Sequence, residues 1–255
     1  MIFYKDVAYN QTCKLDMYFP EKEGFTTFVY FHGGGLESGA KDDPRVMILM
    51  ERLVKYGFGF VSVEYRMYSK TEDTGVHFPD YLHDAAEAVA YVKNNVGAYG
   101  GSGKMYVTGS SAGGWLAAML CLNSKFLSKV GVHNDEIDAW IIDSAQMTSH
   151  FNVLKNEKGI DARREQIDEF APLYYVDANT KFSKMLLLFY DNDMVCRLEQ
   201  NLLFYRSVLR FNPNADIEYK CLTGRHCVGI HTENEKGELM YVQEVLDWLD
   251  RKGER

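Results

Sequence analysis

The sequence contains one serine whose neighbours suit nucleophilic chemistry. Ser111 is the middle residue of a Gly-x-Ser-x-Gly stretch, with Gly109 and Gly113 on either side. The partly β-branched residues 104–108 before it predict a buried strand, and the small, apolar residues 112–122 after it predict a buried helix. At such a turn the glycines let the backbone close, the serine hydroxyl stands above the sheet, and the helix start favours a developing anion. We therefore predict that Ser111 is a nucleophile.

A second glycine-rich stretch could stabilise the anion that this nucleophile creates. The sequence His32-Gly33-Gly34-Gly35 follows a continuous apolar run at 26–31, which predicts a central strand. Glycines leave backbone N–H groups free to point into a cleft. Two such donors, together with the N–H group of Ala112 after the nucleophile, would bind the oxyanion of a tetrahedral intermediate.

A serine nucleophile needs a histidine base, and the base needs an orienting carboxylate. After a turn of this kind, the acid precedes the histidine in the chain. Two histidines, His226 and His231, follow the last predicted strand at 217–221. His226 lies in the loop that leaves this strand, where an imidazole can reach Ser111, whereas His231 lies farther out in a polar segment. We therefore favour His226 as the base.

Three aspartates are candidates for the carboxylate. Asp191 and Asp193 directly follow the predicted strand at 185–190, and Asp143 ends the predicted strand at 137–142. Each of them could instead serve as a helix cap or a turn residue, because aspartate is common at both. We favour Asp193 over Asp191 and place Asp143 third.

Strands and helices alternate along most of the chain, which predicts an α/β fold: a mostly parallel central sheet of about eight strands with helices on both faces. Residues 1–255 are expected to form a single domain. In it, a small lid-like insertion at about 146–182, with two short helices, lies over the C-terminal edge of the sheet, where active sites of open α/β sheets lie. Strands are predicted at 3–8, 14–19, 26–31, 59–63, 104–108, 137–142, 185–190 and 217–221, and helices at 44–56, 80–95, 112–122, 197–210 and 235–251.

Composition and charge narrow the range of partners. The chain has 255 residues and a net charge of −8, which argues against nucleic acid or an anionic membrane surface as the main partner. It contains no apolar run of 18 or more residues and no leader-like start, and its five cysteines have no regular spacing. Reduced thiols in a cytoplasmic protein fit this pattern better than disulfides. The sequence has no metal-ligand cluster, so we expect neither a metal nor a cofactor.

Taken together, the motifs resemble those of the α/β-hydrolase superfamily, in its carboxylesterase branch related to hormone-sensitive lipase. Besides the two glycine motifs, the resemblance rests on Val63-Glu64-Tyr65-Arg66, Phe78-Pro79-Asp80-Tyr81-Leu82-His83-Asp84-Ala85 and Ala171-Pro172-Leu173. It implies the α/β-hydrolase fold, with the following site: Ser111 as nucleophile, Asp193 as acid, His226 as base, and Gly34, Gly35 and Ala112 as oxyanion donors.

Two positions depart from the family pattern. Ser110 stands before the nucleophile, where the family often has aspartate. Val195 follows Asp193 by two residues, whereas the family usually has a valine three residues after its acid. The first departure changes the electrostatics near the nucleophile, and the second makes Asp193 the weakest of the three assignments.

The resemblance implies a serine carboxylesterase that works through an acyl-enzyme. The insertion at 146–182 is short and largely polar, and only 31 residues precede His32, so we expect the N-terminal cap of larger relatives to be missing. A long acyl chain needs a broad apolar surface. We therefore expect a small ester substrate with a short acyl group, such as an acetyl ester of a sugar or small alcohol. An amidase, arylformamidase or peptidase-like hydrolase is the alternative, and a non-catalytic binding protein on the same fold is a third interpretation.

Overall fold

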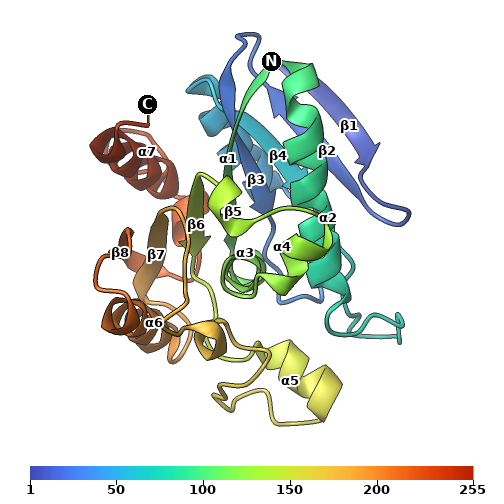
Figure 1. The fold of residues 1–255 in the computed structure, drawn as a ribbon, viewed down its shortest axis with the longest axis vertical. Coiled ribbons are helices and arrows are strands. Elements are labelled where there is room, and N and C mark those ends of the chain that lie inside the picture. The colour runs from blue at the N-terminus through green and yellow to red at the C-terminus, as the bar shows by residue number, and fades with distance from the viewer. Residues whose placement is uncertain (255) are drawn as a thin grey trace.

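A computed structural model describes residues 1–254 of the protein. Its framework is an eight-stranded sheet in the order β1-β2-β4-β3-β5-β6-β7-β8 (Figure 1). β2 pairs antiparallel with β1 and β4, and all the other pairs are parallel, which confirms the predicted sheet. The strands are β1 (Ile2–Ala8), β2 (Lys14–Phe19), β3 (Phe25–Phe31), β4 (Gly59–Val63), β5 (Gly101–Ser110), β6 (Ala139–Asp143), β7 (Met185–Asn192) and β8 (Ile217–Arg225).

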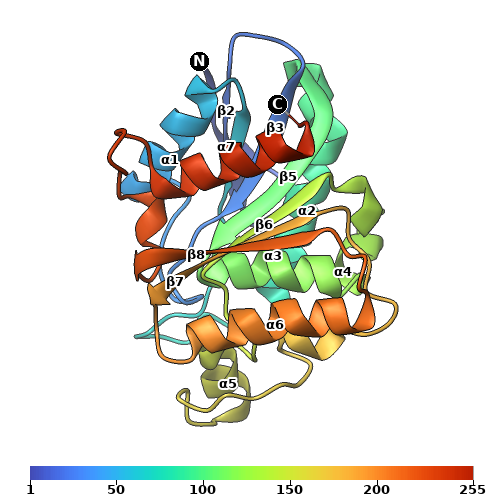
Figure 2. The same ribbon diagram turned by 90° about the vertical axis from the view of Figure 1, so that its left-hand side faces the viewer.

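Helices cover both faces of the sheet, as predicted (Figures 1 and 2). Alternate residues of β3 show the two layers, because Val29 joins one buried apolar cluster while Phe28 and Tyr30 join the other. The helices α1 (Pro44–Lys55) and α7 (Met240–Lys252) pack into the cluster of Phe28. The cluster of Val29 takes apolar residues from α2 (Asp80–Asn95), α3 (Ala112–Leu122), α4 (Lys125–Lys129) and α6 (Arg197–Phe211).

Three element ends differ from the sequence prediction by three residues or more. The strand β5 begins at Gly101, and β8 runs on to Arg225 instead of ending at Cys221. The helix α7 begins at Met240 because a tight turn precedes it, in which Gly237 adopts a φ of +76° and Glu233 forms a β-bridge with Leu239. The extension of β8 matters most, because it carries the strand up to the residue before His226.

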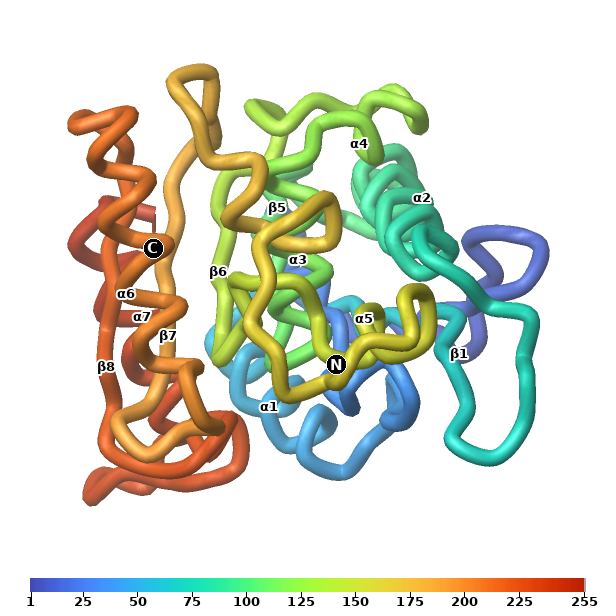
Figure 3. Tube along the Cα trace, turned by 90° about the horizontal axis from the view of Figure 1, so that it is seen from below, coloured from blue at the N-terminus to red at the C-terminus, as the bar shows by residue number. Residues whose placement is uncertain are grey.

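The segment between β6 and β7 contains one α-helix and a short 3₁₀ helix. These are α5 (Phe151–Lys158) and η3 (Pro172–Tyr175). α5 lies beyond α3 at the lower end of the molecule in Figure 1, and in front of it in the view from below (Figure 3). The segment is anchored to α3, because the indole Nε1 of Trp115 donates a hydrogen bond of 3.1 Å to the carbonyl oxygen of Phe170.

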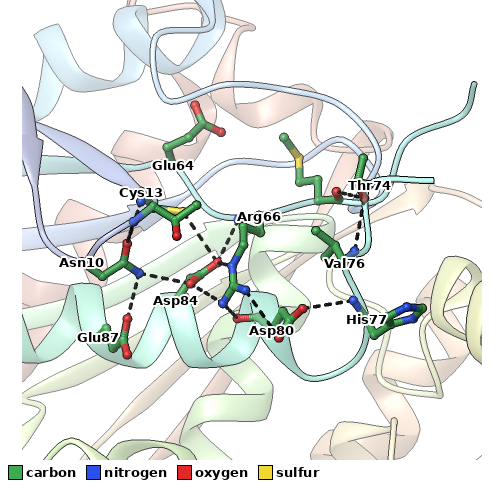
Figure 4. A network of polar contacts seen from close by, with 12 residues as sticks. Asn10, Cys13, Glu64, Arg66, Thr74, Val76, His77, Asp80, Asp84 and Glu87 are labelled. Carbon is green, nitrogen blue, oxygen red and sulfur yellow. Dashed lines mark hydrogen bonds and ion pairs between the residues drawn. The ribbon is translucent and has the colours of Figure 1, made fainter. Parts of the chain in front are cut away.

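A polar network ties the first hairpin to α2 (Figure 4). Its centre is the carboxylate of Asp84, which accepts hydrogen bonds from Nε and Nη2 of Arg66 at 2.8 and 2.9 Å. The amide of Asn10 donates to the same carboxylate at 3.1 Å, and the thiol of Cys13 contacts it at 3.7 Å. Two of the segments that carry the family resemblance therefore meet in one structural ion pair.

Candidate active site

Ser111 lies on a sharp turn between β5 and α3, in the middle of the sheet. Its φ is +57°, a strained value for a residue with a side chain. The flanking glycines are required by space: a Cβ on Gly109 would lie 2.4 Å from the backbone of Gly113, and a Cβ on Gly113 would lie 1.9 Å from the carbonyl oxygen of Phe31. The amide of Ser111 donates a hydrogen bond of 2.8 Å to the carbonyl oxygen of Asp143 on the neighbouring strand.

His226 bridges Ser111 and Asp193. Its Nε2 lies 2.8 Å from the hydroxyl oxygen of Ser111, and its Nδ1 forms a hydrogen bond with Oδ1 of Asp193. With a proton on Nδ1, the imidazole donates to the carboxylate and accepts from the serine hydroxyl. Because β8 runs to Arg225, residues 222–225 belong to the strand and not to the loop that the sequence suggested, and His226 lies in the turn directly after the strand.

The carboxylate of Asp193 is surrounded by donors. The amide of Met194 donates to Oδ1 at 2.6 Å, and the hydroxyl of Ser144 donates to Oδ2 at 2.8 Å. Burial pushes the pKa of Asp193 up, but the hydrogen bonds from His226, Met194 and Ser144 and the charge of His226 outweigh it, so the pKa lies below its usual value. Asp193 is therefore ionised over the working pH range.

The other candidate acids and the second histidine have different surroundings. Asp191 is exposed and accepts a hydrogen bond of 2.9 Å from the amide of Gly224. Asp143 is fully buried and accepts from the hydroxyl of Tyr190 at 3.0 Å, and burial raises its pKa to about 6. His231 is exposed at the rim of the cavity described below. Among these groups, Asp193 alone is hydrogen-bonded to His226 within residues 1–254.

The glycine loop after β3 presents its backbone to the same place. Gly34 has a φ of +124°, and a Cβ there would lie 1.8 Å from the carbonyl oxygen of Ser38, so no other residue fits. Gly35 has a φ of +67°, and its carbonyl oxygen accepts a hydrogen bond of 2.6 Å from the amide of Asn152. In residues 1–254, the backbone N–H groups of Gly34, Gly35 and Ala112 have no hydrogen-bond acceptor. They are free to bind an anion.

His32 has a supporting place that the sequence did not reveal. It is buried, its Nδ1 lies 2.8 Å from the carbonyl oxygen of Gly33, and its Nε2 lies 3.1 Å from a carboxylate oxygen of Glu64. Its ring stacks on Tyr65 with centroids 4.5 Å apart, and the hydroxyl of Tyr65 donates to the carbonyl oxygen of His32 at 2.7 Å. The segment Val63-Glu64-Tyr65-Arg66 thus holds the glycine loop in place. The sequence signal that could have pointed to this contact was the presence of both motifs in one chain.

A cavity of about 380 Å³ opens over these groups. Gly34, Gly35, Ser111 and His226 line it, whereas Ala112 is buried and does not. The remaining wall is mixed: apolar side chains come from Val46, Phe151, Met194 and Ile230, and charged ones from Glu37, Asp43, Arg45 and Lys70.

Residues 1–254 offer neither a metal site nor a membrane-spanning helix. No group of three or more His, Cys, Asp or Glu side chains could hold a metal ion. None of the helices is long and apolar enough to pass through a membrane.

Comparison with known proteins extends the resemblance. Residues 15–208, more than half of the chain, match the sequence model of the BD-FAE family. Over 143 residues the chain is 29% identical to a probable isoprenylcysteine alpha-carbonyl methylesterase of Oryza sativa subsp. japonica, a match that covers 55% of this chain and 31% of that protein. The chain spans less than a third of the length of the curated relatives it matches.

Solved structures share the whole fold. The thermophilic esterase Est2 of Thermogutta terrifontis superposes with a TM-score of 0.74 and 19% identity, over 96% of this chain and 91% of that one. A truncated carbohydrate esterase from gut microbiota superposes with a TM-score of 0.74 and 19% identity, over 100% of this chain and 97% of that one. The chain has the α/β-hydrolase fold and belongs to the BD-FAE family.

Proposed function

We propose that the protein is a serine carboxylesterase with Ser111 as nucleophile, His226 as base and Asp193 as acid. The observation that carries the proposal is the hydrogen-bonded chain from Asp193 through His226 to Ser111, which ends at the wall of a cavity. A histidine hydrogen-bonded on one side to a carboxylate and on the other to a serine hydroxyl is the arrangement that activates serine. The free N–H groups of the glycine loop lie beside it.

Each group then has a role in the reaction. The hydroxyl oxygen of Ser111 attacks the ester carbonyl carbon while Nε2 of His226 takes the proton, and Asp193 stabilises the resulting imidazolium. The carbonyl oxygen becomes an anion that the N–H groups of Gly34, Gly35 and Ala112 bind. His226 gives its proton to the departing alcohol, and the same groups then direct water onto the acyl-enzyme, which releases the acid.

The size and walls of the cavity favour a short acyl group. A volume of about 380 Å³ must hold both the acyl group and part of the alcohol. Charged side chains stand among the apolar ones in its wall, which suits a long acyl chain poorly. Est2 has been solved with butyrate bound, and another structural relative is called a carbohydrate esterase. We infer acetyl or similarly short acyl esters of a sugar or small alcohol as substrates.

A series of p-nitrophenyl esters tests the proposal. We expect kcat/KM to be highest at about two to four acyl carbons, because each further methylene must find apolar surface worth about 0.8 kcal/mol that the cavity does not supply. A maximum at ten or more carbons would contradict the short-acyl part. A matched anilide and a formamide, run beside the acetate, separate an esterase from an amidase: the esterase proposal fails if the amide is the better substrate.

We also propose that residues 1–255 form one domain, with the segment at about 146–182 as its roof. Phe151 and Asn152 at the start of α5 line the cavity, so this segment borders the site. Limited proteolysis that releases a stable, active fragment without this segment would argue against the proposal.

A further inference from the structure

Ser144, directly after β6, is in an unusual conformation for a buried serine. Its side chain is inaccessible to solvent, and its φ is +50°. Non-glycine residues rarely adopt such values, and where they do, the surroundings must hold them there. The amide of Ser144 nevertheless keeps a hydrogen bond of 2.8 Å to the carbonyl oxygen of Leu188 on β7. The turn therefore redirects the side chain and the carbonyl group without breaking the sheet.

The side chain of Ser144 connects the loops that carry the acid and the base. Its hydroxyl donates to Oδ2 of Asp193 at 2.8 Å, and it accepts a hydrogen bond of 3.3 Å from the amide of Cys227. Cys227 is the residue after His226. One hydroxyl group thus touches the carboxylate on one side and the backbone next to the imidazole on the other.

The nucleophile is tied to the same point of the sheet. The amide of Ser111 donates to the carbonyl oxygen of Asp143, the residue before Ser144. The two-residue segment 143–144 therefore contacts the segments that carry the nucleophile, the acid and the base. These segments come from three different strands, and the end of β6 lies between them.

A buried arginine holds Ser144 in its strained conformation. Arg197, the first residue of α6, is 3% exposed, and its Nη1 donates to the carbonyl oxygen of Ser144 at 2.6 Å. Among residues 1–254, no carboxylate lies within ion-pair distance of this guanidinium. Burying a cation without a direct counter-ion is costly, so the contact with the turned carbonyl group is its main compensation.

We propose that Ser144 is a positioning residue of the active site: it sets the orientation of the Asp193 carboxylate and fixes that carboxylate relative to His226. The inference rests on the proposed function. The side chain of Asp193 has no solvent exposure, and in residues 1–254 the hydroxyl of Ser144 is the one donor to Oδ2. Without that donor, the carboxylate can rotate away from Nδ1 of His226. A small misplacement of this kind lowers catalysis by up to about 100-fold.

Two substitutions separate the hydroxyl from the backbone strain. Ser144→Ala and Ser144→Gly both remove the hydroxyl, but glycine adopts a φ of +50° freely and alanine does not. We expect both variants to lower kcat for p-nitrophenyl acetate by about 10- to 100-fold, with little change in KM. Ser149→Ala is the matched control, because the hydroxyl of Ser149 is also buried and also donates to a carboxylate, that of Asp168. Its kcat is expected to stay within about twofold of the wild type.

A double-mutant cycle tests whether Ser144 acts through Asp193. If it does, Ser144→Gly lowers kcat in the wild-type background but changes it less than about twofold when Asp193→Asn is already present. Full activity of Ser144→Gly, or an equal loss in both backgrounds, overturns the proposal. A wild-type protein that hydrolyses no ester and is not labelled by a fluorophosphonate refutes the proposed function, which is a different outcome.

Discussion

Two aspartates, Asp84 and Asp193, each have a buried carboxylate with several hydrogen-bond donors, yet their partners differ. The side chain of Asp84 is 1% exposed and that of Asp193 is 0% exposed. Asp84 meets the guanidinium of Arg66 through two hydrogen bonds (Figure 4), and it does not line the cavity over Ser111. Asp193 meets the imidazole of His226, whose other nitrogen contacts a hydroxyl at the cavity wall.

The difference shows why one network is structural and the other can do chemistry. A guanidinium stays charged at any working pH and has no acceptor, so the pair of Arg66 and Asp84 can only hold segments together. An imidazole changes its charge near neutral pH and can both accept and donate a proton. Burial and a dense set of donors are common to both carboxylates, so they do not identify a catalytic group. The identity of the partner does.

The largest effect is expected for Ser111→Ala. Removing the nucleophile should lower kcat by about 10⁶-fold, the size known for subtilisin, because binding and the oxyanion donors alone remain. The folding stability should hardly change, since one hydroxyl at the cavity wall contributes little. Ester hydrolysis and thermal unfolding of the same preparation measure both. Retention of more than a few per cent of the activity would rule out Ser111 as the nucleophile.

The next largest effect is expected for Asp193→Asn. The imidazole then loses the carboxylate that fixes its tautomer and stabilises its charged form, and the matching change in trypsin lowers kcat by about 10⁴-fold. Asp191→Asn is the matched control, because Asp191 lies two residues away and, among residues 1–254, its side chain is hydrogen-bonded to the amide of Gly224 and not to His226. We expect it to change kcat less than about threefold. If the two variants exchange these outcomes, Asp191 is the acid.

Breaking the other network should affect stability and leave the chemistry intact. Asp84→Asn removes the buried one of the two carboxylates that face Arg66, while Asp80 stays 3.5 Å away, and we expect it to lower the free energy of unfolding by about 3 kcal/mol. The kcat of the folded fraction should match the wild type. Urea unfolding and titration of active sites with a fluorophosphonate measure the two quantities separately. A large loss of kcat per active site would mean that this network also positions the site.

The smallest effect concerns a third buried carboxylate, that of Asp143, and it depends on pH. Burial raises its pKa from 3.8 to about 6. The folded state therefore binds this proton more tightly than the unfolded state, so the stability of the fold falls as the pH rises from about 4 to about 6. Above that range the protein bears the full free-energy cost of burying the ionised carboxylate of Asp143. About two pKa units correspond to about 2–3 kcal/mol. Asp143→Asn should raise the free energy of unfolding by that amount at pH 8 and by little at pH 4. An equal gain at both pH values would contradict the assignment.

Much of the site could be predicted because its signals are local. Ser111 and the glycine loop are identified by short motifs, and the steric clashes at Gly109, Gly113 and Gly34 explain why these motifs need glycine. The alternating elements were sufficient to predict the sheet. The residues alone favoured Asp193 but left Asp191 open, because both lie at the end of the same strand, and the resemblance then implied Asp193.

The supporting residues could not be predicted, because their contacts depend on the order of the strands. Ser144 reaches Asp193 only because β6 lies between β5 and β7 in the sheet. The buried position of Arg197 is also invisible in the sequence, since arginine at a helix start usually suggests a surface. The end of β8 was misplaced because residues 223–225, which extend the strand, are Thr, Gly and Arg, are largely exposed as expected for an edge strand, and give no apolar pattern to follow.

The place of β8 at the edge of the sheet has a consequence for how the protein responds to heat. Ser111 follows β5, which is flanked by strands on both sides, whereas His226 follows β8, which within residues 1–254 is hydrogen-bonded to β7 alone. Edge elements open by local fraying at a lower free energy than the core. Warming should therefore detach the base from the serine while the rest of the sheet is still intact. Thermal inactivation would then begin below the global melting temperature and reverse on cooling, with the amide protons of β8 exchanging ahead of those of β5.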